Sequence, residues 1–165
     1  MSTFTMPFDD SKSVRRVWIR IQKEEDNDDL SSTQLLSSQR AKRTCPRWIY
    51  CAKSRIPGAS IAVFTSKLLK PNTFFGPYIG IRHQSSRKAD NSTYAWTIEY
   101  SNGKIHSYID AIDQTKSNWL RYVNCTCTVN QENLIPIQYN SNIFYKTIRI
   151  IQPNEELLVY SKNLK

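Results

Sequence analysis

The chain has 165 residues, a length that suits one domain of ordinary size with a tail. Its hydrophobic fraction of 39% is low for a fully packed globule, which predicts that part of the chain stays outside the core. No apolar stretch is long enough to span a bilayer, which excludes a helical membrane protein. The net charge of +9 is compatible with nucleic-acid or nucleosome partners, and equally with a solvated basic surface.

Residues 1–44 are expected to form a disordered or weakly structured N-terminal arm. Residues 17–21 are compatible with a short strand or a docking peptide, but an acidic run at 24–29 and a polar run at 31–34 follow at once. Such a segment buries too little apolar surface to offset the entropy lost on ordering. The folded domain is therefore expected to occupy residues 45–165.

From about Cys45 the sequence changes to short strand-like runs separated by turn residues. Two runs, at 48–51 and 60–64, flank the turn signal Pro57-Gly58. A third run begins at Tyr94 and alternates apolar and polar residues as a strand does, and the turn at 101–103 leads from it into a fourth run at 104–109.

The second half of the domain follows the same pattern. One or two helical turns are expected at 114–122, and a second hairpin at 134–139 and 143–151 around the turn 140–142. A last turn at 153–154 precedes a strand at 157–160. The predicted fold class is mostly β, with many short strands and short helices.

The four cysteines are expected to be free thiols. Without a secretory signal, disulfides are not expected. The spacing also lacks the paired C-x-x-C pattern of a structural zinc site, so no metal is expected. The thiols are those of Cys45, Cys51, Cys125 and Cys127.

Four segments, in their order along the chain, resemble the PR domain, a divergent SET domain of the PRDM chromatin regulators. They are FGPYIG at 75–80, KSNWLRYVNC at 116–125, QENL at 131–134 with IFYKT at 143–147, and IIQPNEELLV at 150–159. The resemblance covers about residue 45 to the C-terminus. It implies a SET-domain fold of several small curved sheets, with a C-terminal pseudoknot in which the last segment threads under the region of Asn124.

The resemblance also implies the positions of two binding sites. S-adenosylmethionine would lie on one face, where Asn124 would bond its charged amino-acid end and the backbone at Cys125 would reach the adenine. The implied cofactor-binding residues are Ser60, Ile61, Ala62, Tyr94, Asn124 and Cys125.

On the opposite face a target lysine would enter a narrow aromatic channel. Tyr78 and Tyr145 match tyrosines that border this channel and are the implied catalytic residues. The implied substrate-binding residues are Tyr94, Trp96 and Ser161. For each aromatic taken singly, packing in the core is an equally good interpretation, whereas the family position of Asn124 favours a role in the site.

The chemistry explains why aromatic residues recur there. Methyl transfer needs a neutral amine, and neutralising a lysine of pKa about 10.4 at pH 7 costs about 4–5 kcal/mol. A dry aromatic channel lowers that cost because it disfavours the ammonium form. No acid–base dyad is required.

Three features depart from active relatives. Ser161 stands where these relatives have a tyrosine that orients the amine, and Tyr160 would replace it only after a one-residue slip that turns it to the other face. Ser60 and Ala62 stand where a Gly-x-Gly loop lets the backbone approach the cofactor. A C-terminal extension that closes over the channel is not present in this sequence.

Two functions of different class follow, besides a degenerate product that has lost both. One is a protein-lysine methyltransferase acting on a histone tail or another lysine-bearing protein. The other is a non-catalytic PR module that recruits chromatin or transcriptional partners. Both predict a nuclear protein without membrane contact. Sequence-specific DNA binding is not expected, because the family assigns that task to zinc fingers.

Overall fold

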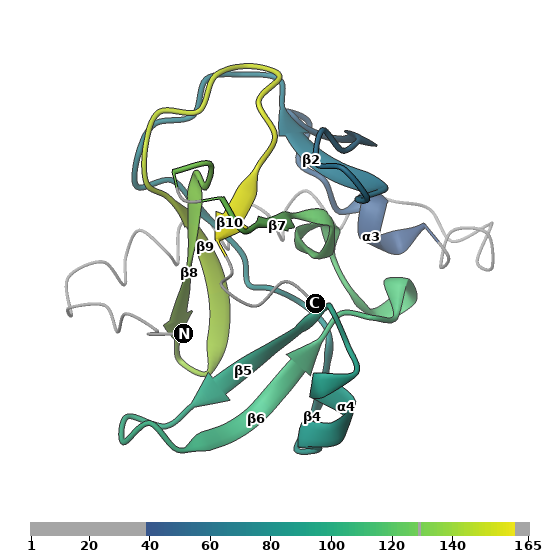
Figure 1. Ribbon diagram of the computed structural model, residues 1–165, viewed down its shortest axis with the longest axis vertical. Helices are drawn as coiled ribbons and strands as arrows, with labels where there is room; N and C mark the ends of the chain where they lie inside the picture. Colours follow the sequence, from purple (N-terminus) through teal and green to yellow (C-terminus); the bar gives the residue numbers. More distant parts are fainter. Residues whose placement is uncertain (1–38, 129, 161–165) are drawn as a thin grey trace.

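The computed structural model describes residues 39–128 and 130–160, which form three small sheets with short helices between them (Figure 1). Strand is the main secondary structure, so the mostly-β class is confirmed. The short helices are α3 (Arg40–Arg43), α4 (Ser86–Asp90) and the 3-10 turns η1 (Gln114–Lys116) and η2 (Trp119–Tyr122).

Two of the sheets are antiparallel throughout. A two-stranded sheet pairs β1 (Ile49–Lys53) with β2 (Ile61–Thr65). A three-stranded sheet has the order β4-β6-β5, at the bottom of Figure 1. Its strands are β4 (Ile81–His83), β5 (Ala95–Glu99) and β6 (Ile105–Asp110).

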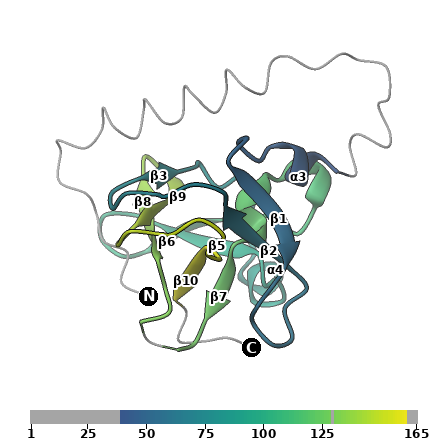
Figure 2. The same cartoon turned by 90° about the horizontal axis from the view of Figure 1, so that it is seen from above.

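The third sheet has five strands in the order β3-β9-β8-β10-β7. Its strands are β3 (Phe74–Phe75), β7 (Asn124–Thr126), β8 (Leu134–Tyr139), β9 (Asn142–Thr147) and β10 (Leu158–Tyr160). β10 inserts between β7 and β8 and runs parallel to both, and Figure 2 shows it beside β7 from above. The last described segment thus lies directly beside Asn124, with which Leu158 pairs.

The β8–β9 hairpin turns where the sequence predicts it. Asn140 and Ser141 have φ values of 45° and 57°, the positive angles that a two-residue type I′ turn requires at both central positions. The predicted second strand was too long, however: β9 ends at Thr147, not at Ile151. The last paired residues of the hairpin are Leu134 and Thr147. Beyond them the Ile148 N–H still donates to the Asn133 carbonyl, but Ile151 pairs with Leu69 instead.

One large core joins all three sheets, and two of its fully buried side chains, Trp119 and Leu120, come from η2. Trp119 is 1% exposed, and the centre of its ring lies 5.5 Å from that of the Phe75 ring in a T-shaped arrangement. Leu120, also fully buried, belongs to the same cluster as Tyr145 and Val159. Packing of Trp119 and Leu120 in the core therefore anchors η2, the segment that leads into Asn124.

The folded part begins earlier than the predicted boundary at residue 45. In α3, Ala41 is fully buried. The Thr44 hydroxyl accepts a hydrogen bond from the Trp119 backbone N–H at 2.8 Å, and Arg40 donates to the Ser117 carbonyl at 2.6 Å. These tertiary contacts place residues 39–44 in the domain. Residues 1–38, with the candidate strand at 17–21, lie outside the described residues.

Candidate functional site

Four of the aromatic residues implied by the resemblance come from three separate segments. Tyr78 follows β3, Tyr94 and Trp96 lie at the start of β5, and Tyr145 lies in β9. The Tyr145 ring centre lies 6.0 Å from that of Tyr78 and 5.9 Å from that of Trp96. Tyr78 and Tyr145 are 4% and 2% exposed. These residues form the aromatic cluster.

Two glycines set the path of the backbone around Tyr78. A Cβ on Gly76 would lie 2.6 Å from the Phe144 ring, and the φ of Gly76 is +141°. A Cβ on Gly80 would lie 2.5 Å from the Asp110 carbonyl oxygen. The chain can therefore pass directly along β9 and β6, and the Tyr78 N–H donates to the Ile143 carbonyl at 2.7 Å.

The polar ends of the aromatic cluster are paired. The Tyr78 hydroxyl donates to the Tyr94 carbonyl at 2.9 Å, and the Trp96 Nε1–H donates to the Tyr145 hydroxyl at 2.9 Å. Burial raises the pKa of Tyr78 and that of Tyr145 well above the ordinary phenol value, although the Arg121 charge acts in the opposite direction on Tyr78. Both phenols are therefore neutral at physiological pH.

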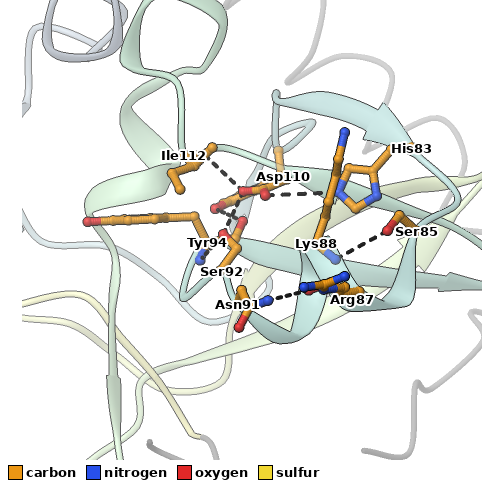
Figure 3. Close-up of polar contacts among 10 residues, drawn as sticks. His83, Ser85, Arg87, Lys88, Asn91, Ser92, Tyr94, Asp110 and Ile112 are labelled. Atoms are coloured by element: carbon orange, nitrogen blue, oxygen red, sulfur yellow. Dashed lines mark hydrogen bonds and ion pairs between the residues drawn. The ribbon is translucent and has the colours of Figure 1, made fainter.

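A network that the sequence reasoning missed holds Tyr94. Its backbone N–H donates to the Ser92 hydroxyl at 3.1 Å, and that hydroxyl donates to Asp110 at 2.7 Å, as Figure 3 shows. The Arg121 guanidinium lies 4.2 Å from the centre of the Tyr94 ring. Arg121 lies in the KSNWLRYVNC block, so the resemblance to the PR domain could have indicated it as a site residue. Ser92 and Asp110 lie outside the four matching segments, and nothing in the sequence indicated them.

A second group, here called the Asn124 cluster, joins β7 to β2. The Asn124 side-chain N–H group donates to the Ile61 carbonyl at 3.0 Å and to Glu156 at 3.2 Å. Glu156 is 5% exposed and also accepts from the Ser54 hydroxyl and the Arg55 N–H, each at 2.8 Å. Sequence reasoning named Asn124 and Ile61 but not the carboxylate that joins them.

The remaining cofactor positions lie around the Asn124 cluster. Ser60 is exposed, whereas Ala62 is fully buried and pairs with Ala52 of β1. Cys125 is half-buried against the main core, and burial raises the pKa of its thiol. Cys125 packs on the core that contains Tyr78 and Tyr145, and its neighbour Asn124 belongs to the Asn124 cluster, so β7 contacts both groups.

The last predicted site residue, Ser161, lies outside the described residues. Its neighbour Tyr160 is half-buried in β10, and Val159 is fully buried in the core. Side chains alternate along a strand, so Tyr160 lies on the opposite face from Val159.

Residues 39–128 and 130–160 contain no group of three or more His, Cys, Asp or Glu side chains that could hold a metal ion. In the same ranges, no helix is long and apolar enough to cross a membrane.

Comparison with known proteins identifies the domain. The family model for the PR domain of PR domain zinc finger protein 2 matches residues 49–164. The rat PR domain zinc finger protein 2 is 34% identical over 82% of the chain. The human histone-lysine N-methyltransferase PRDM7 is 37% identical over 74% of the chain, and set-17, a histone-lysine N-methyltransferase of Caenorhabditis elegans, is 33% identical over 86%. The chain spans only 8%, 25% and 47% of the lengths of these three relatives.

Solved structures agree with the sequence relatives. The methyltransferase domain of human PR domain-containing protein 2 superimposes with a TM-score of 0.65 and 31% identity, covering 84% of this chain and 95% of that one. A polycomb complex in an autoinhibited conformation bound to S-adenosylmethionine gives a TM-score of 0.53 at 19% identity, over 72% of this chain and 15% of that one, which supports the fold alone. The predicted SET-domain fold is confirmed, and the chain belongs to the PR/SET-domain family of PRDM proteins.

Proposed function

We propose that this domain is a chromatin and transcription regulator that transfers the methyl group of S-adenosylmethionine to a lysine of a histone tail or another protein, at a reduced rate. The observation that carries the proposal is the aromatic cluster, in which buried, neutral Tyr78 and Tyr145 lie beside Trp96 with their hydroxyls held by hydrogen bonds.

The chemistry of the Asn124 cluster fits the cofactor. The cofactor carries cationic ammonium and sulfonium groups, and this cluster contains the Ile61 carbonyl and the Glu156 carboxylate beside Asn124. Acceptor oxygens and a buried negative charge favour a cation. Ile61, Asn124 and the β7 backbone at Cys125 would therefore hold the cofactor, with Tyr94 lining the side toward the lysine. When bound, S-adenosylmethionine supplies an electrophilic methyl group.

The chain's own contribution is to bind the lysine, exclude water and align the amine. The aromatic cluster provides a water-poor wall, which favours the neutral form of an entering amine. Tyr94 would line both the cofactor site and the lysine channel. Its position depends on Ser92, Asp110 and Arg121. Holding amine and methyl group in line contributes through proximity rather than through acid–base catalysis.

The reduced rate follows from the end of β10. Active relatives carry at the position of Ser161 a tyrosine whose hydroxyl orients the amine. Tyr160 lies on the opposite face from Val159, so it does not replace that hydroxyl without a register shift. A looser amine spends less time in line with the methyl group.

The partners follow from the same proposal. Two relatives bear the name histone-lysine N-methyltransferase. A histone tail or other lysine-bearing protein is therefore the proposed substrate, chromatin-associated proteins are the proposed partners, and the nucleus is the proposed location. The net charge of +9 suits the acidic surfaces of chromatin.

A second candidate is a non-catalytic PR module that recruits chromatin or transcriptional partners. Two observations favour it: the Asn124 amide group is already bonded within the protein, and the side chain of Ala62 fills a position where a glycine would leave room. Such a module would bind its partner even after Asn124→Ala.

Calorimetric titration of S-adenosylmethionine into the full chain, followed by radiolabel transfer to histones, tests both candidates. The methyltransferase predicts saturable binding, loss of binding in Asn124→Ala, and slower transfer in Tyr145→Phe. Tyr139→Phe is the matched control, since Tyr139 packs on the separate small cluster of Phe74, Ile137 and Phe144. Absence of cofactor binding refutes the methyltransferase, and binding without transfer at high enzyme concentration supports the non-catalytic module.

A further inference from the structure

Two cysteines outside the proposed site lie in direct contact. Cys45 follows α3 and Cys51 lies in β1, and their sulfur atoms are 3.8 Å apart. The backbone between them turns sharply, because the Ile49 N–H donates to the Pro46 carbonyl at 2.8 Å. Both side chains are half-buried. The fold therefore brings two thiols together at a half-buried position.

The surroundings distinguish the two thiols chemically. The hydrogen bond from Cys45 lowers the pKa of Cys51, and the charge of Lys42 acts in the same direction, while burial opposes both. The same hydrogen bond, with burial, raises the pKa of Cys45. Cys51 is therefore the more readily ionised sulfur of the pair, and the thiolate is the nucleophile in thiol chemistry.

We propose that Cys45 and Cys51 are a reversible modification site, a dithiol that hydrogen peroxide converts into a disulfide. The Cys51 thiolate attacks one peroxide oxygen, the O–O bond breaks, and a sulfenic acid and hydroxide form. Cys45 then loses its proton and attacks the Cys51 sulfur; the S–S bond forms and the S–O bond breaks. The displaced hydroxide leaves as water with that proton, and the hydroxide formed in the first step takes up the proton that Cys51 released when it ionised. The sulfurs lose two electrons, and one peroxide becomes two waters.

The required movement is small. A disulfide needs a sulfur–sulfur distance of about 2.05 Å, so the two sulfurs must approach by less than the width of one atom. The other two cysteines differ from this pair: Cys127 is exposed, and Cys125 is half-buried with a pKa raised by burial. Cys127 is more accessible to a reagent, so selective formation of a disulfide at the Cys45–Cys51 pair rests on the contact between its two sulfurs, which gives the oxidised sulfur a resolving thiol beside it. The inference concerns the thiols alone and does not depend on methyl transfer.

Peptide mapping of the full native chain tests the proposal. The protein is titrated with hydrogen peroxide, its remaining thiols are alkylated, and it is digested with trypsin. Cleavage after Arg43, Arg47 and Lys53 places Cys45 and Cys51 in different peptides, 44–47 and 48–53, whereas Cys125 and Cys127 stay together in peptide 122–146. Any pairing between these peptides is therefore read directly by mass.

We expect peptides 44–47 and 48–53 to appear as one linked species at peroxide doses at which Cys127 is still alkylated. Addition of dithiothreitol should release them. The proposal is overturned if both peptides remain separately alkylated up to the dose that oxidises Cys127, or if the linked species contains peptide 122–146.

Two single substitutions assign the roles. In Cys45→Ser, Cys51 has lost its resolving partner and should accumulate as a sulfenic acid that dimedone traps. In Cys51→Ser, Cys45 should take up at least ten-fold less dimedone at the same dose. Preferential labelling of Cys45 would overturn the assignment of Cys51 as the nucleophile, and the mapping of the native chain stands whether or not either variant folds.

Discussion

The carboxylate of Glu156 allows a quantitative test of how the Asn124 cluster is built. It is 5% exposed and accepts hydrogen bonds from three donors: the Ser54 hydroxyl, the Arg55 N–H and the Asn124 amide group. Hydrogen bonds to charged groups contribute about 1.5–3 kcal/mol each, while the buried charge itself is costly to desolvate. Glu156→Ala removes both, so we expect a net loss of about 2–4 kcal/mol in the free energy of unfolding.

Glu156→Gln separates charge from shape. One carboxylate oxygen accepts from Ser54 and Asn124 and the other from Arg55, so either orientation of the new amide directs its NH2 group at a donor. The expected loss is about 1–2 kcal/mol. Glu155→Gln is the matched control: Glu155 is partly exposed and its ion pair with Arg149 contributes about 0–1 kcal/mol. The amide oxygen of the new glutamine can still accept one of the two hydrogen bonds that Glu155 receives from Asn133 and the Gln152 N–H.

Urea unfolding of the full chain, followed by tryptophan fluorescence, measures all three variants. The expected order of destabilisation is Glu156→Ala, then Glu156→Gln, then Glu155→Gln. The reasoning is refuted if both Glu156 variants lie within about 0.5 kcal/mol of the native chain, the range of an ordinary surface substitution. In that case Glu156 does not hold the Asn124 cluster together.

Three further predictions concern the aromatic cluster, the backbone and pH. Tyr145→Phe leaves the Trp96 N–H without its acceptor and should reduce the free energy of unfolding by about 1–2 kcal/mol in the same urea assay. Gly76→Ala should prevent folding or lower the Tm by about 10 °C or more, because a Cβ would lie 2.6 Å from a β9 ring, whereas Gly58→Ala, with open space around it, should lower Tm much less; equal effects would contradict this. Burial acts to raise the pKa of Glu155, but its hydrogen bonds outweigh burial and lower it, so this stabilisation is present above the ordinary glutamate pKa and lost as pH falls below it. Glu155→Gln should therefore differ from the native chain at neutral pH and converge with it in acid unfolding measurements.

Local sequence patterns predicted the elements that depend on neighbouring residues. The turn at 140–142 was predicted because Asn and Ser are common in turns, and the strand at Ala95–Glu99 because its residues alternate. The error in the length of β9 also comes from relying on a local sequence pattern. Residues 148–151 have strand-like composition, but Ile151 leaves the hairpin and pairs with Leu69, and their own sequence does not state which partner they take.

The candidate site was predicted less completely than the fold. Resemblance to the PR domain named Tyr78, Tyr94, Trp96 and Tyr145, and the structure brings them together. It named neither Glu156 nor Asp110, because a buried carboxylate is recognised by the donors around it. Those donors come from segments far away along the chain: Arg55 lies 101 residues from Glu156.

The sequence by itself determined the mostly-β class, the family and the position of the aromatic residues, since all three depend on residue type, spacing and short motifs. Only the tertiary structure decided that residues 39–44 belong to the domain, that β10 runs between β7 and β8, and that Cys45 contacts Cys51. Each of these depends on contacts between elements that meet only after folding. Burial, hydrogen-bond partners and the pKa of a thiol all depend on such contacts, so no local sequence pattern predicts them.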